Sequence, residues 1–178
     1  MLRPVVEQDV ATMLAWRNQP VNREASVHQR VIPAAEHQVW WDRVSGDPRW
    51  RLLVFESEGR PLGIVSFFDL DLASATRTGS WGFYLDHETT TADGTAMLAW
   101  MQVMREATEY AFGEPPAGLG LAELRGEVRP ENEAVRMMNR RFGFSEGEPF
   151  GRQVDEETAW LIPITLRRAD RRTRKGRR

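Results

Sequence analysis

The chain has 178 residues and a formal net charge of −2, and 41% of it is hydrophobic, with eight Phe and seven Trp. This size and composition predict one packed domain and exclude a disordered chain. The lack of cysteine excludes disulfides, a thiol nucleophile and cysteine-ligated zinc, and the scattered histidines (His28, His37 and His87) show no metal-ligand spacing, so we expect no metal.

The first half of the chain carries patterns typical of a strand, two helices and a hairpin. "LRPVV" predicts the strand, and Asp9 is placed to cap a helix that runs through "VATMLAWRN" to Pro20. Residues 21–31 are polar and are expected to be irregular. Pro33 suits the first turn of the second helix, "AAEHQVWWDRV". "WRLLVFES" and "PLGIVSFFDLD", joined by a turn at residues 58–60, predict the hairpin.

The second half continues with strands and helices in alternation. "RTGSWGFYLD" predicts a strand, "HETTTADG" a polar loop, and residues 95–112 a long amphipathic helix. "LAELRGEV" predicts the next strand, "RPENEAVRMMNRRFGF" a helix, and "TAWLIPITL" a last strand. The order β, α, α, β, β, β, α, β, α, β predicts an α/β domain with a mixed, mostly antiparallel sheet and helices on both faces.

The junction between the third long strand and the long helix is the first candidate site. Backbone N–H groups at a helix N-terminus suit a phosphate, and small residues let a ligand approach the main chain. Asp93 opposes this reading, because a carboxylate would repel an anion. The alternative is a solvated loop whose polar side chains only cap the helix. The candidate residues are Thr89, Thr90, Thr91, Ala92, Asp93, Gly94, Thr95 and Ala96.

The helix within residues 129–144 is the second candidate site. Asn132 follows Pro130 and Glu131 where this helix must start, so capping is its simplest role. Asn139 lies mid-helix, where asparagine has poor propensity, so it either faces water or binds something. Both candidate helices follow strands expected to be adjacent and parallel. Their N-termini should therefore open into one crevice beyond the strand ends, where α/β sheets bind ligands.

These segments resemble the acetyl-CoA-binding core of the GNAT N-acetyltransferases. The resemblance rests on the strand and loop that lead to "GTAM", on "LRGEV" and on "NEAVRMMNRRFGF". The likeness extends over residues 1–150 to the PseH-like branch, which acetylates the 4-amine of a nucleotide-linked amino sugar. This wider likeness rests on "WRNQPVNREA", "IPAAEHQVWW", "PLGIVSFFDLD", "SWGFYL" and "EYAF". The RimJ/RimL branch, which acetylates protein N-termini, shares less of the front half.

The resemblance implies a GNAT-like domain over residues 1–166, with a splayed pair of parallel strands and acetyl-CoA as co-substrate. It places the contact that polarises the thioester carbonyl at backbone N–H groups near Tyr84 and Leu85. The sequence departs from the family at two places. Asn139 stands where many members have a tyrosine that protonates the leaving thiolate, and the phosphate loop has Thr89 and Ala92 at its first and fourth positions. We therefore expect a slower enzyme rather than a dead one.

Glu127 is the favoured general base. Strand alternation places Arg125 and Glu127 on one face of "LRGEV", and a carboxylate within a central strand is unusual unless it is paired or functional. The alternative is a salt bridge with Arg125 or another arginine. His37 is the second candidate, acting directly or through water. It shares a helix face with Trp40 and Trp41, so a packed structural histidine is the alternative.

Arg17 and Asn18, at the end of the first helix, are candidates for holding the diphosphate or sugar of the acceptor, because an arginine fork suits phosphate. Their alternative is a simple preference for a helix C-terminus. Trp40, Trp41 and Tyr84 could stack on a base or sugar, yet tryptophans at helical spacing are usually core. We expect one tryptophan in the core and one in the pocket.

Residues 167–178 form an arginine-rich tail with eight of the 24 basic residues and one of the 26 acidic residues. We expect a solvated terminus and no nucleic-acid binding, since the tail has no aromatic residue to stack on bases. No apolar run approaches membrane-spanning length, which predicts a cytoplasmic protein. The resemblance implies that its acceptor is a small molecule. A homodimer is left open. The rival from another class is a non-catalytic acyl-CoA-binding protein.

Overall fold

The computed structural model describes residues 1–154 and 157–171. The strands are β1 (Leu2–Pro4), β2 (Arg51–Ser57), β3 (Arg60–Asp71), β4 (Thr78–Leu85), β5 (Glu123–Val128), β6 (Ser145–Glu146), β7 (Phe150–Val154) and β8 (Glu157–Arg167). The helices are α1 (Val10–Arg17), α2 (Pro20–Glu24), α3 (Ala34–Val44), α4 (His87–Ala92), α5 (Ala96–Phe112) and α6 (Glu133–Phe142), with 3-10 turns at Glu7–Asp9 and Arg168–Asp170.

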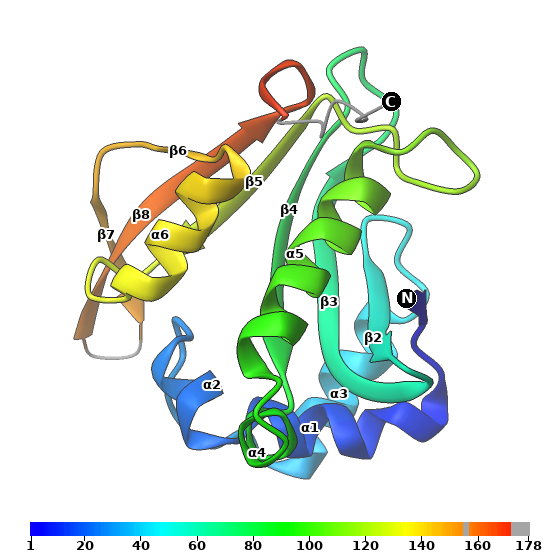
Figure 1. The fold of residues 1–178 in the computed structure, drawn as a ribbon, viewed down its shortest axis with the longest axis vertical. Coiled ribbons are helices and arrows are strands. Elements are labelled where there is room, and N and C mark those ends of the chain that lie inside the picture. Colours follow the sequence, from blue (N-terminus) through cyan, green and yellow to red (C-terminus); the bar gives the residue numbers. More distant parts are fainter. Residues whose placement is uncertain (155–156, 172–178) are drawn as a thin grey trace.

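The strands form one sheet in the order β1-β2-β3-β4-β5-β8-β6, and β7 pairs with the outer part of β8. Neighbouring strands are antiparallel except β4 and β5, which are parallel. Helices α5 and α6 lie on one side of this sheet, α5 over β3 and β4 and α6 beside β5 and β8 (Figure 1). The predicted α/β class and mostly antiparallel sheet are thus confirmed.

The two parallel strands pair over only three residues each. Thr78 to Ser80 of β4 face Glu123 to Arg125 of β5, and no pairing follows. Figure 1 shows the two strands together near the top and diverging toward the bottom, with α5 and α6 on either side of the divergence. The sheet is therefore split along one line, as the predicted splayed pair requires.

Residues on the two sides of the sheet form two apolar clusters. The larger one fills the space between the sheet, α5 and α6 and includes Phe67, Trp81 and Phe144. The smaller one joins α1 to the opposite face of β2 and β3 through Met13 and Trp16. Helices therefore cover both faces, and side chains of β4 alternate between the two clusters because successive residues of a strand point to opposite faces.

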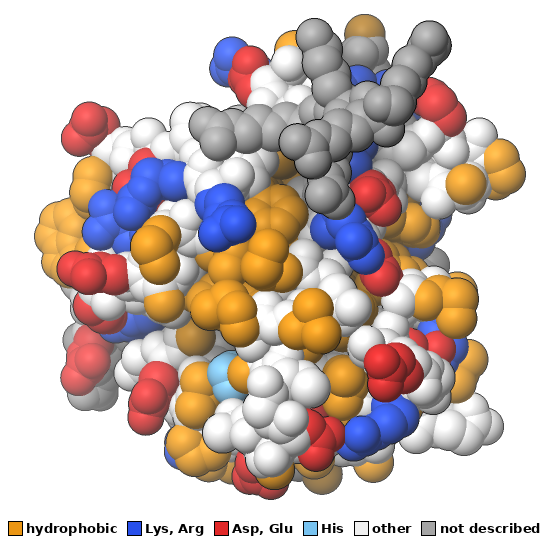
Figure 2. Space-filling model, viewed as in Figure 1, with side chains coloured by type: hydrophobic (Ala, Val, Ile, Leu, Met, Phe, Trp, Pro, Cys, Tyr) orange, Lys and Arg blue, Asp and Glu red, His pale blue; other side chains and the backbone are white. Residues whose placement is uncertain are grey.

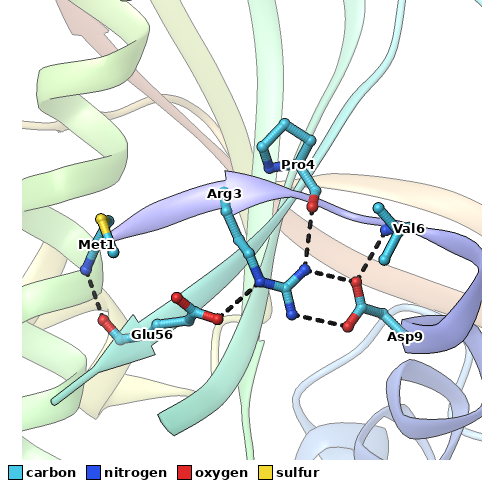
Figure 3. A network of polar contacts seen from close by, with 6 residues as sticks. All are labelled: Met1, Arg3, Pro4, Val6, Asp9 and Glu56. Atoms are coloured by element: carbon cyan, nitrogen blue, oxygen red, sulfur yellow. Dashed lines mark hydrogen bonds and ion pairs between the residues drawn. The ribbon is translucent and has the colours of Figure 1, made fainter. Parts of the chain in front are cut away.

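The hairpin and the N-terminal network fix the first three strands. Glu58 and Gly59 both have positive φ, 53° and 74°, as a two-residue type I′ turn requires. Arg3 on β1 binds Asp9 through two nitrogens at 2.7 and 2.9 Å and Glu56 on β2 at 2.7 Å (Figure 3). The Asp9 carboxylate also accepts from the Val6 N–H at 2.9 Å. Asp9 thus precedes α1 as predicted, but its side chain makes no capping hydrogen bond to that helix.

Two short helices were not predicted. Residues 21–31 were expected to be irregular, but α2 begins at Pro20, and the expected polar loop at residues 87–94 contains α4. Asp86 caps α4 by accepting from the Thr89 N–H at 3.2 Å, and Gln19 binds both the Asp86 carboxylate and the His87 N–H. Long-range side-chain bonds therefore hold a segment whose local helix propensity is poor.

The strand that precedes the basic tail continues to Arg167, and the Arg168 side chain binds Glu114 at 2.6 Å. Residues 172–178, most of the predicted tail, lie outside the described residues. Within residues 1–154 and 157–171, no helix is both long and apolar enough to cross a membrane.

Candidate active site

Backbone groups of β4 line the opening between β4 and β5. An antiparallel ladder alternates hydrogen-bonded and non-bonded pairs. The Asp86 N–H donates to Leu62 O of β3 at 2.8 Å, so Leu85, the residue before it, is not bonded to β3. The N–H groups of Leu85 and of Phe83, two residues back, consequently point away from β3 toward the opening. The Tyr84 N–H is used in pairing with β3, so Phe83 rather than Tyr84 shares the opening with Leu85.

An apolar band lies between α5 and α6 in front of this opening (Figure 2). On the two helices the band consists of partly buried side chains that pack on the larger core cluster, Trp100 and Met101 on α5 and Val135 and Phe142 on α6. Met97, in the first turn of α5, is 58% exposed. An apolar surface therefore extends from the first turn of α5 toward the split sheet.

The predicted phosphate loop forms α4 and the turn into α5. Thr90 is fully buried and its hydroxyl donates to Asp86 O at 2.8 Å, so it acts within the protein. Asp93 is exposed and pairs with Arg60 at 3.1 Å. Gly94 has φ +68°, a conformation that favours glycine, and it lets the chain turn into α5. Thr89, Thr91, Ala92, Thr95 and Ala96 surround this turn, and Thr95 is the N-cap residue without a side-chain cap bond.

The two asparagines of α6 differ in their bonding. Asn132 caps the helix, because its side chain accepts from the Val135 N–H at 3.3 Å. Asn139 is 3% exposed, and within the described part of the chain its side-chain amide makes no hydrogen bond. Its amide atoms are not among the fully buried polar atoms that lack a partner, so they keep some access to solvent. Asn139 therefore carries an unused hydrogen-bonding group, as a ligand-binding residue would.

A cleft of about 960 Å³ opens on the other face of the sheet, between α3, the split of β4 and β5, and β7. Five predicted acceptor-site residues line it together: Arg17, His37, Trp40, Tyr84 and Glu127. Asn18 does not line it. The Asn18 amide instead exchanges two hydrogen bonds with the backbone of Ile32, each at 2.9 Å, which fixes the loop before α3.

Glu127 lies just beyond the last pair of β4 and β5, on the same face of β5 as Arg125. Its two carboxylate oxygens accept from Nη1 and Nη2 of Arg152, each at 2.6 Å, and Arg152 also lines the cleft. Arg125 pairs with Glu123 instead. The alternative of a salt bridge for Glu127 is thus realised, with an arginine of β7 as the partner.

Of the three aromatic residues predicted on α3, Trp41 lies in the core, whereas His37 and Trp40 line the cleft. Trp41 is 8% exposed and its indole Nε1 donates to Glu7 at 2.6 Å, whereas Trp40 lines the cleft. The His37 ring lies 5.1 Å from that of Trp40. Burial lowers the pKa of His37, so its imidazole is neutral near pH 7. A neutral imidazole at the cleft wall can accept a proton.

The cleft also contains an aromatic row that the sequence did not predict. Trp50 meets Trp40 edge-on at 6.1 Å between ring centroids and stacks on Phe68 at 5.3 Å, and all three line the cleft. Trp50 begins the hairpin and Phe68 lies in a strand, so nothing local links them to α3. The expected register of the hairpin places Trp50 opposite Phe68 and could have suggested that these two rings stack.

Arg17 and Tyr84 lie near each other on the cleft wall. Burial lowers the pKa of Arg17 and raises that of Tyr84, and the charge of each group acts on the other. Arg17 Nη2 donates to His28 O at 2.9 Å, while among the described residues its Nη1 is buried without a hydrogen-bond partner. The cleft thus holds a cation with unused donor capacity. Within the described residues, no group of His, Asp and Glu could hold a metal ion.

Comparisons with known proteins agree on the fold. A family model described as an acetyltransferase (GNAT) domain matches residues 1–145. The structure is similar to a spermidine N-acetyltransferase from Vibrio cholerae in complex with CoA and spermine (TM-score 0.78, 14% identity, 96% of each chain covered). It is also similar to a ribosomal-protein-alanine N-acetyltransferase from Brucella melitensis (TM-score 0.63, 17% identity, 94% of this chain and 99% of that chain covered). No match was found among curated proteins.

Proposed function

The chain belongs to the acetyltransferase (GNAT) family and is an acyltransferase, and we propose that its acceptor is the 4-amino group of a nucleotide-activated amino-deoxysugar. One observation carries the transferase chemistry: β4 and β5 separate after Ser80 and Arg125 and leave an opening between two helices on one face and a large cleft on the other. Two substrates that enter from opposite faces can meet in such an opening.

The cofactor side suits acetyl-CoA, the co-substrate of GNAT enzymes. The N–H groups of Phe83 and Leu85 can donate hydrogen bonds to the extended arm of the cofactor and to its thioester carbonyl. The cofactor would then accept these bonds in place of a neighbouring strand. The first turn of α5 leaves backbone N–H groups without partners inside the helix, which suits a diphosphate. The apolar band between α5 and α6 supplies the apolar surface of this side.

The acceptor side supports an anionic substrate with a ring. The unused Arg17 donor suits a phosphate. The row of Trp40, Trp50 and Phe68 offers flat surfaces for a base or a sugar. A polyamine, the ligand of the Vibrio cholerae structure, carries only positive charge and would be repelled by the unpaired Arg17.

Glu127 is the proposed general base, with His37 as the second candidate. The parallel register would place Glu127 opposite Gly82 if the strands had stayed paired, so its side chain faces the cleft at the opening itself. Glu127 takes one proton from the acceptor ammonium, and the free amine nitrogen then bonds to the acetyl carbon as the carbon–sulfur bond breaks. The sulfur leaves as a thiolate, and the new amide nitrogen loses its second proton, which the thiolate takes up to give the free thiol. A thiol pKa of about 8.5 allows the sulfur to leave without full protonation, and the buried Asn139 amide can donate a hydrogen bond to it.

A thiol-release assay over matched amines tests the proposal. Acetyl-CoA would be combined in turn with a nucleotide-linked 4-amino-sugar, spermidine and a peptide with an N-terminal alanine. We expect the sugar nucleotide to have the highest kcat/KM. A higher value for the peptide would favour the protein N-terminal acetyltransferase that the Brucella melitensis likeness also supports. Stoichiometric acetyl-CoA binding without thiol release on any amine would favour a non-catalytic acyl-CoA-binding protein.

The base is tested by substitution in the same assay. Glu127→Gln should lower kcat by about 10²–10⁴, the usual contribution of a general base, and leave acetyl-CoA affinity unchanged. His37→Asn is the matched variant on the opposite wall of the cleft. If it carried the larger loss of kcat, the base would be His37. The homodimer and the cytoplasmic location stay predictions, and light scattering would test the former.

A further inference from the structure

The proposed base is not free in the structure, because Arg152 occupies both of its carboxylate oxygens. The two hydrogen bonds are parallel, each 2.6 Å long, and form a bidentate ion pair. The guanidinium fills the lone-pair positions that face it on both oxygens, so while the pair holds an acceptor ammonium can reach the carboxylate only from its outer side. Movement of Arg152 away from Glu127 would open the whole carboxylate to the acceptor.

The position of Arg152 makes such a movement feasible. It lies on β7, which among the described strands pairs only with β8, at the far end of the sheet. Its side chain is 43% exposed, and its guanidinium also lies 5.5 Å from the centre of the Phe150 ring. A long exposed side chain can adopt a new rotamer without disturbing the core.

The other charges of the cleft indicate what the released guanidinium would bind. Glu36 lines the cleft, but its carboxylate is already paired with Arg30, and Asp69 is an exposed residue of β3 where its register with β4 shifts. Three further arginines line the cleft: Arg17 on the α1 side, Arg43 on α3, and Arg125, which is paired with Glu123. A positively charged acceptor would leave Arg152 in place and would itself be repelled, whereas an anionic acceptor offers the guanidinium a new partner.

We infer that Arg152 is a specificity-determining positioning residue that exchanges Glu127 for an anionic group, a phosphate, of the acceptor. This inference rests on the proposed function, since it takes Glu127 as the base. Binding of the phosphate draws Arg152 away and frees the carboxylate, which then accepts the ammonium proton as described above. An amine without a nearby anion meets a base that Arg152 still partly covers, so charge on the acceptor selects the substrate as well as binding it.

The test compares Arg152→Gln with the wild-type enzyme on two acceptors, a nucleotide-linked 4-amino-sugar and the methyl glycoside of the same sugar. Hydrogen bonds to charged groups are worth about 1.5–3 kcal/mol, so KM for the nucleotide-linked sugar should rise about 10-fold to 100-fold. For the glycoside, which carries no anion, kcat/KM should rise, because the base is free from the start. Equal changes on both acceptors, or none, would overturn the inference.

Two controls keep the result specific. Arg125→Gln removes another arginine of the cleft that does not touch Glu127, and it should not raise kcat/KM for the glycoside. The gain from Arg152→Gln should vanish when Glu127→Gln is also present, because Arg152 acts through that carboxylate. If the gain survives in the double variant, Arg152 does not act through Glu127.

A binding measurement separates failure of this inference from failure of the proposed function. Absence of thiol release from the wild-type enzyme on every amine would refute the proposed function alone. Inorganic pyrophosphate, added with coenzyme A at saturation to block the cofactor side, should still raise the unfolding temperature of the wild-type protein. It should raise that of Arg152→Gln much less. Equal stabilisation of both proteins would refute the exchange of Arg152 onto a phosphate.

Discussion

The two ends of the β4–β5 pair are built differently although they belong to the same two strands. At the closed end, Gly79 lies against Leu70 and Leu121, and an added Cβ would approach Leu70 to 2.6 Å, so the strands and their neighbours are tightly packed. At the open end, a Cβ added to Gly126 would meet Ile164 at 3.2 Å and Trp81 Cδ1 at 3.5 Å, so the Trp81 ring of β4 lies against β5 just where the pairing has ended. The strands are thus paired at one end, and the Trp81 ring lies between them at the other. We call this ring the wedge.

The open end is held by groups that replace the missing strand pairing. The Asn22 amide on α2 donates to Leu85 O at 2.8 Å and to Trp16 O at 2.7 Å, so the last carbonyl of β4 is satisfied. The Trp81 ring packs on Phe67, Phe83 and Phe144. The difference between the ends teaches that the opening is a folded feature rather than a frayed one, because specific side chains stabilise it.

Removing the wedge should have the largest effect on stability. Trp81 is 6% exposed, so Trp81→Ala should lower the free energy of unfolding by about 3–5 kcal/mol, as for other buried aromatic residues, and should weaken acetyl-CoA binding. Urea unfolding measures the first and titration calorimetry the second. Trp160→Ala is the matched control, since Trp160 is 57% exposed and its loss should change stability by less than about 0.5 kcal/mol. Similar losses in both variants would argue against the wedge.

Crowding the open end from β3 should cost less. A Cβ on Gly63 would lie 2.6 Å from Tyr84 O and 3.2 Å from Leu85 Cα, and backbone atoms cannot give way easily. Gly63→Ala should therefore destabilise the protein by about 1–3 kcal/mol and shift the Leu85 N–H, which lowers kcat/KM. Gly82→Ala is the control on β4, where an added Cβ meets no atom within 4 Å. Thermal unfolding of both would show whether β4 tolerates movement at its open end.

The sequence predicted the elements whose side chains repeat with a clear period. The hairpin, the long helix at residues 95–112, the last strand and the alternation in "LRGEV" all follow from local patterns, and the observed bounds agree closely. The parallel neighbours β4 and β5 follow from the order of strands and helices. The short helices α2 and α4 could not be predicted in this way, because Gln19, Asn22 and Asp86 hold them through contacts distant in sequence.

The candidate site was predictable as a set of residues but not as a set of contacts. Arg17, His37, Trp40, Tyr84 and Glu127 come together in one cleft. Their bonding depends on partners that no spacing identifies, and the pair of Glu127 and Arg152, 25 residues apart, is the clearest case. The spacing likewise did not show which of Trp40 and Trp41 belongs to the core. Trp41 does, because it is buried and its indole Nε1 donates to Glu7. The burial of Trp41 and the partial burial of Trp40 depend on tertiary packing.

Two buried asparagines should respond to the same substitution in opposite ways. Asn22 has both amide hydrogens bonded, so Asn22→Leu should destabilise the protein by about 1–3 kcal/mol because two backbone carbonyls lose their donor. Asn139 makes no side-chain hydrogen bond among the described residues, so Asn139→Leu should be neutral or stabilising by up to about 1 kcal/mol. Turnover should nevertheless fall in Asn139→Leu. Destabilisation equal to that of Asn22→Leu would mean that the Asn139 amide supports the fold.

The pH dependence of stability should show the smallest effect, and it concerns the cleft side of the open end. Burial lowers the pKa of His37 below its ordinary value of 6.5, so the unfolded chain takes up a proton at that site before the folded one does as the pH falls. Below about pH 6.5 the unfolded state therefore binds more protons, and His37 makes the folded state progressively less stable until its own lowered pKa is passed.

His37→Asn should accordingly lose less stability than the wild-type protein between about pH 7 and pH 5, measured by urea unfolding at each pH. Burial also lowers the pKa of His87, but that residue is present in both proteins and cancels in the difference. If the free energy of unfolding changed with pH equally in both proteins, the cleft would be keeping water at the His37 ring. A difference between the two proteins that changes with pH in this way would show that this wall of the open end is dry, which keeps the His37 imidazole neutral to a lower pH than an ordinary histidine.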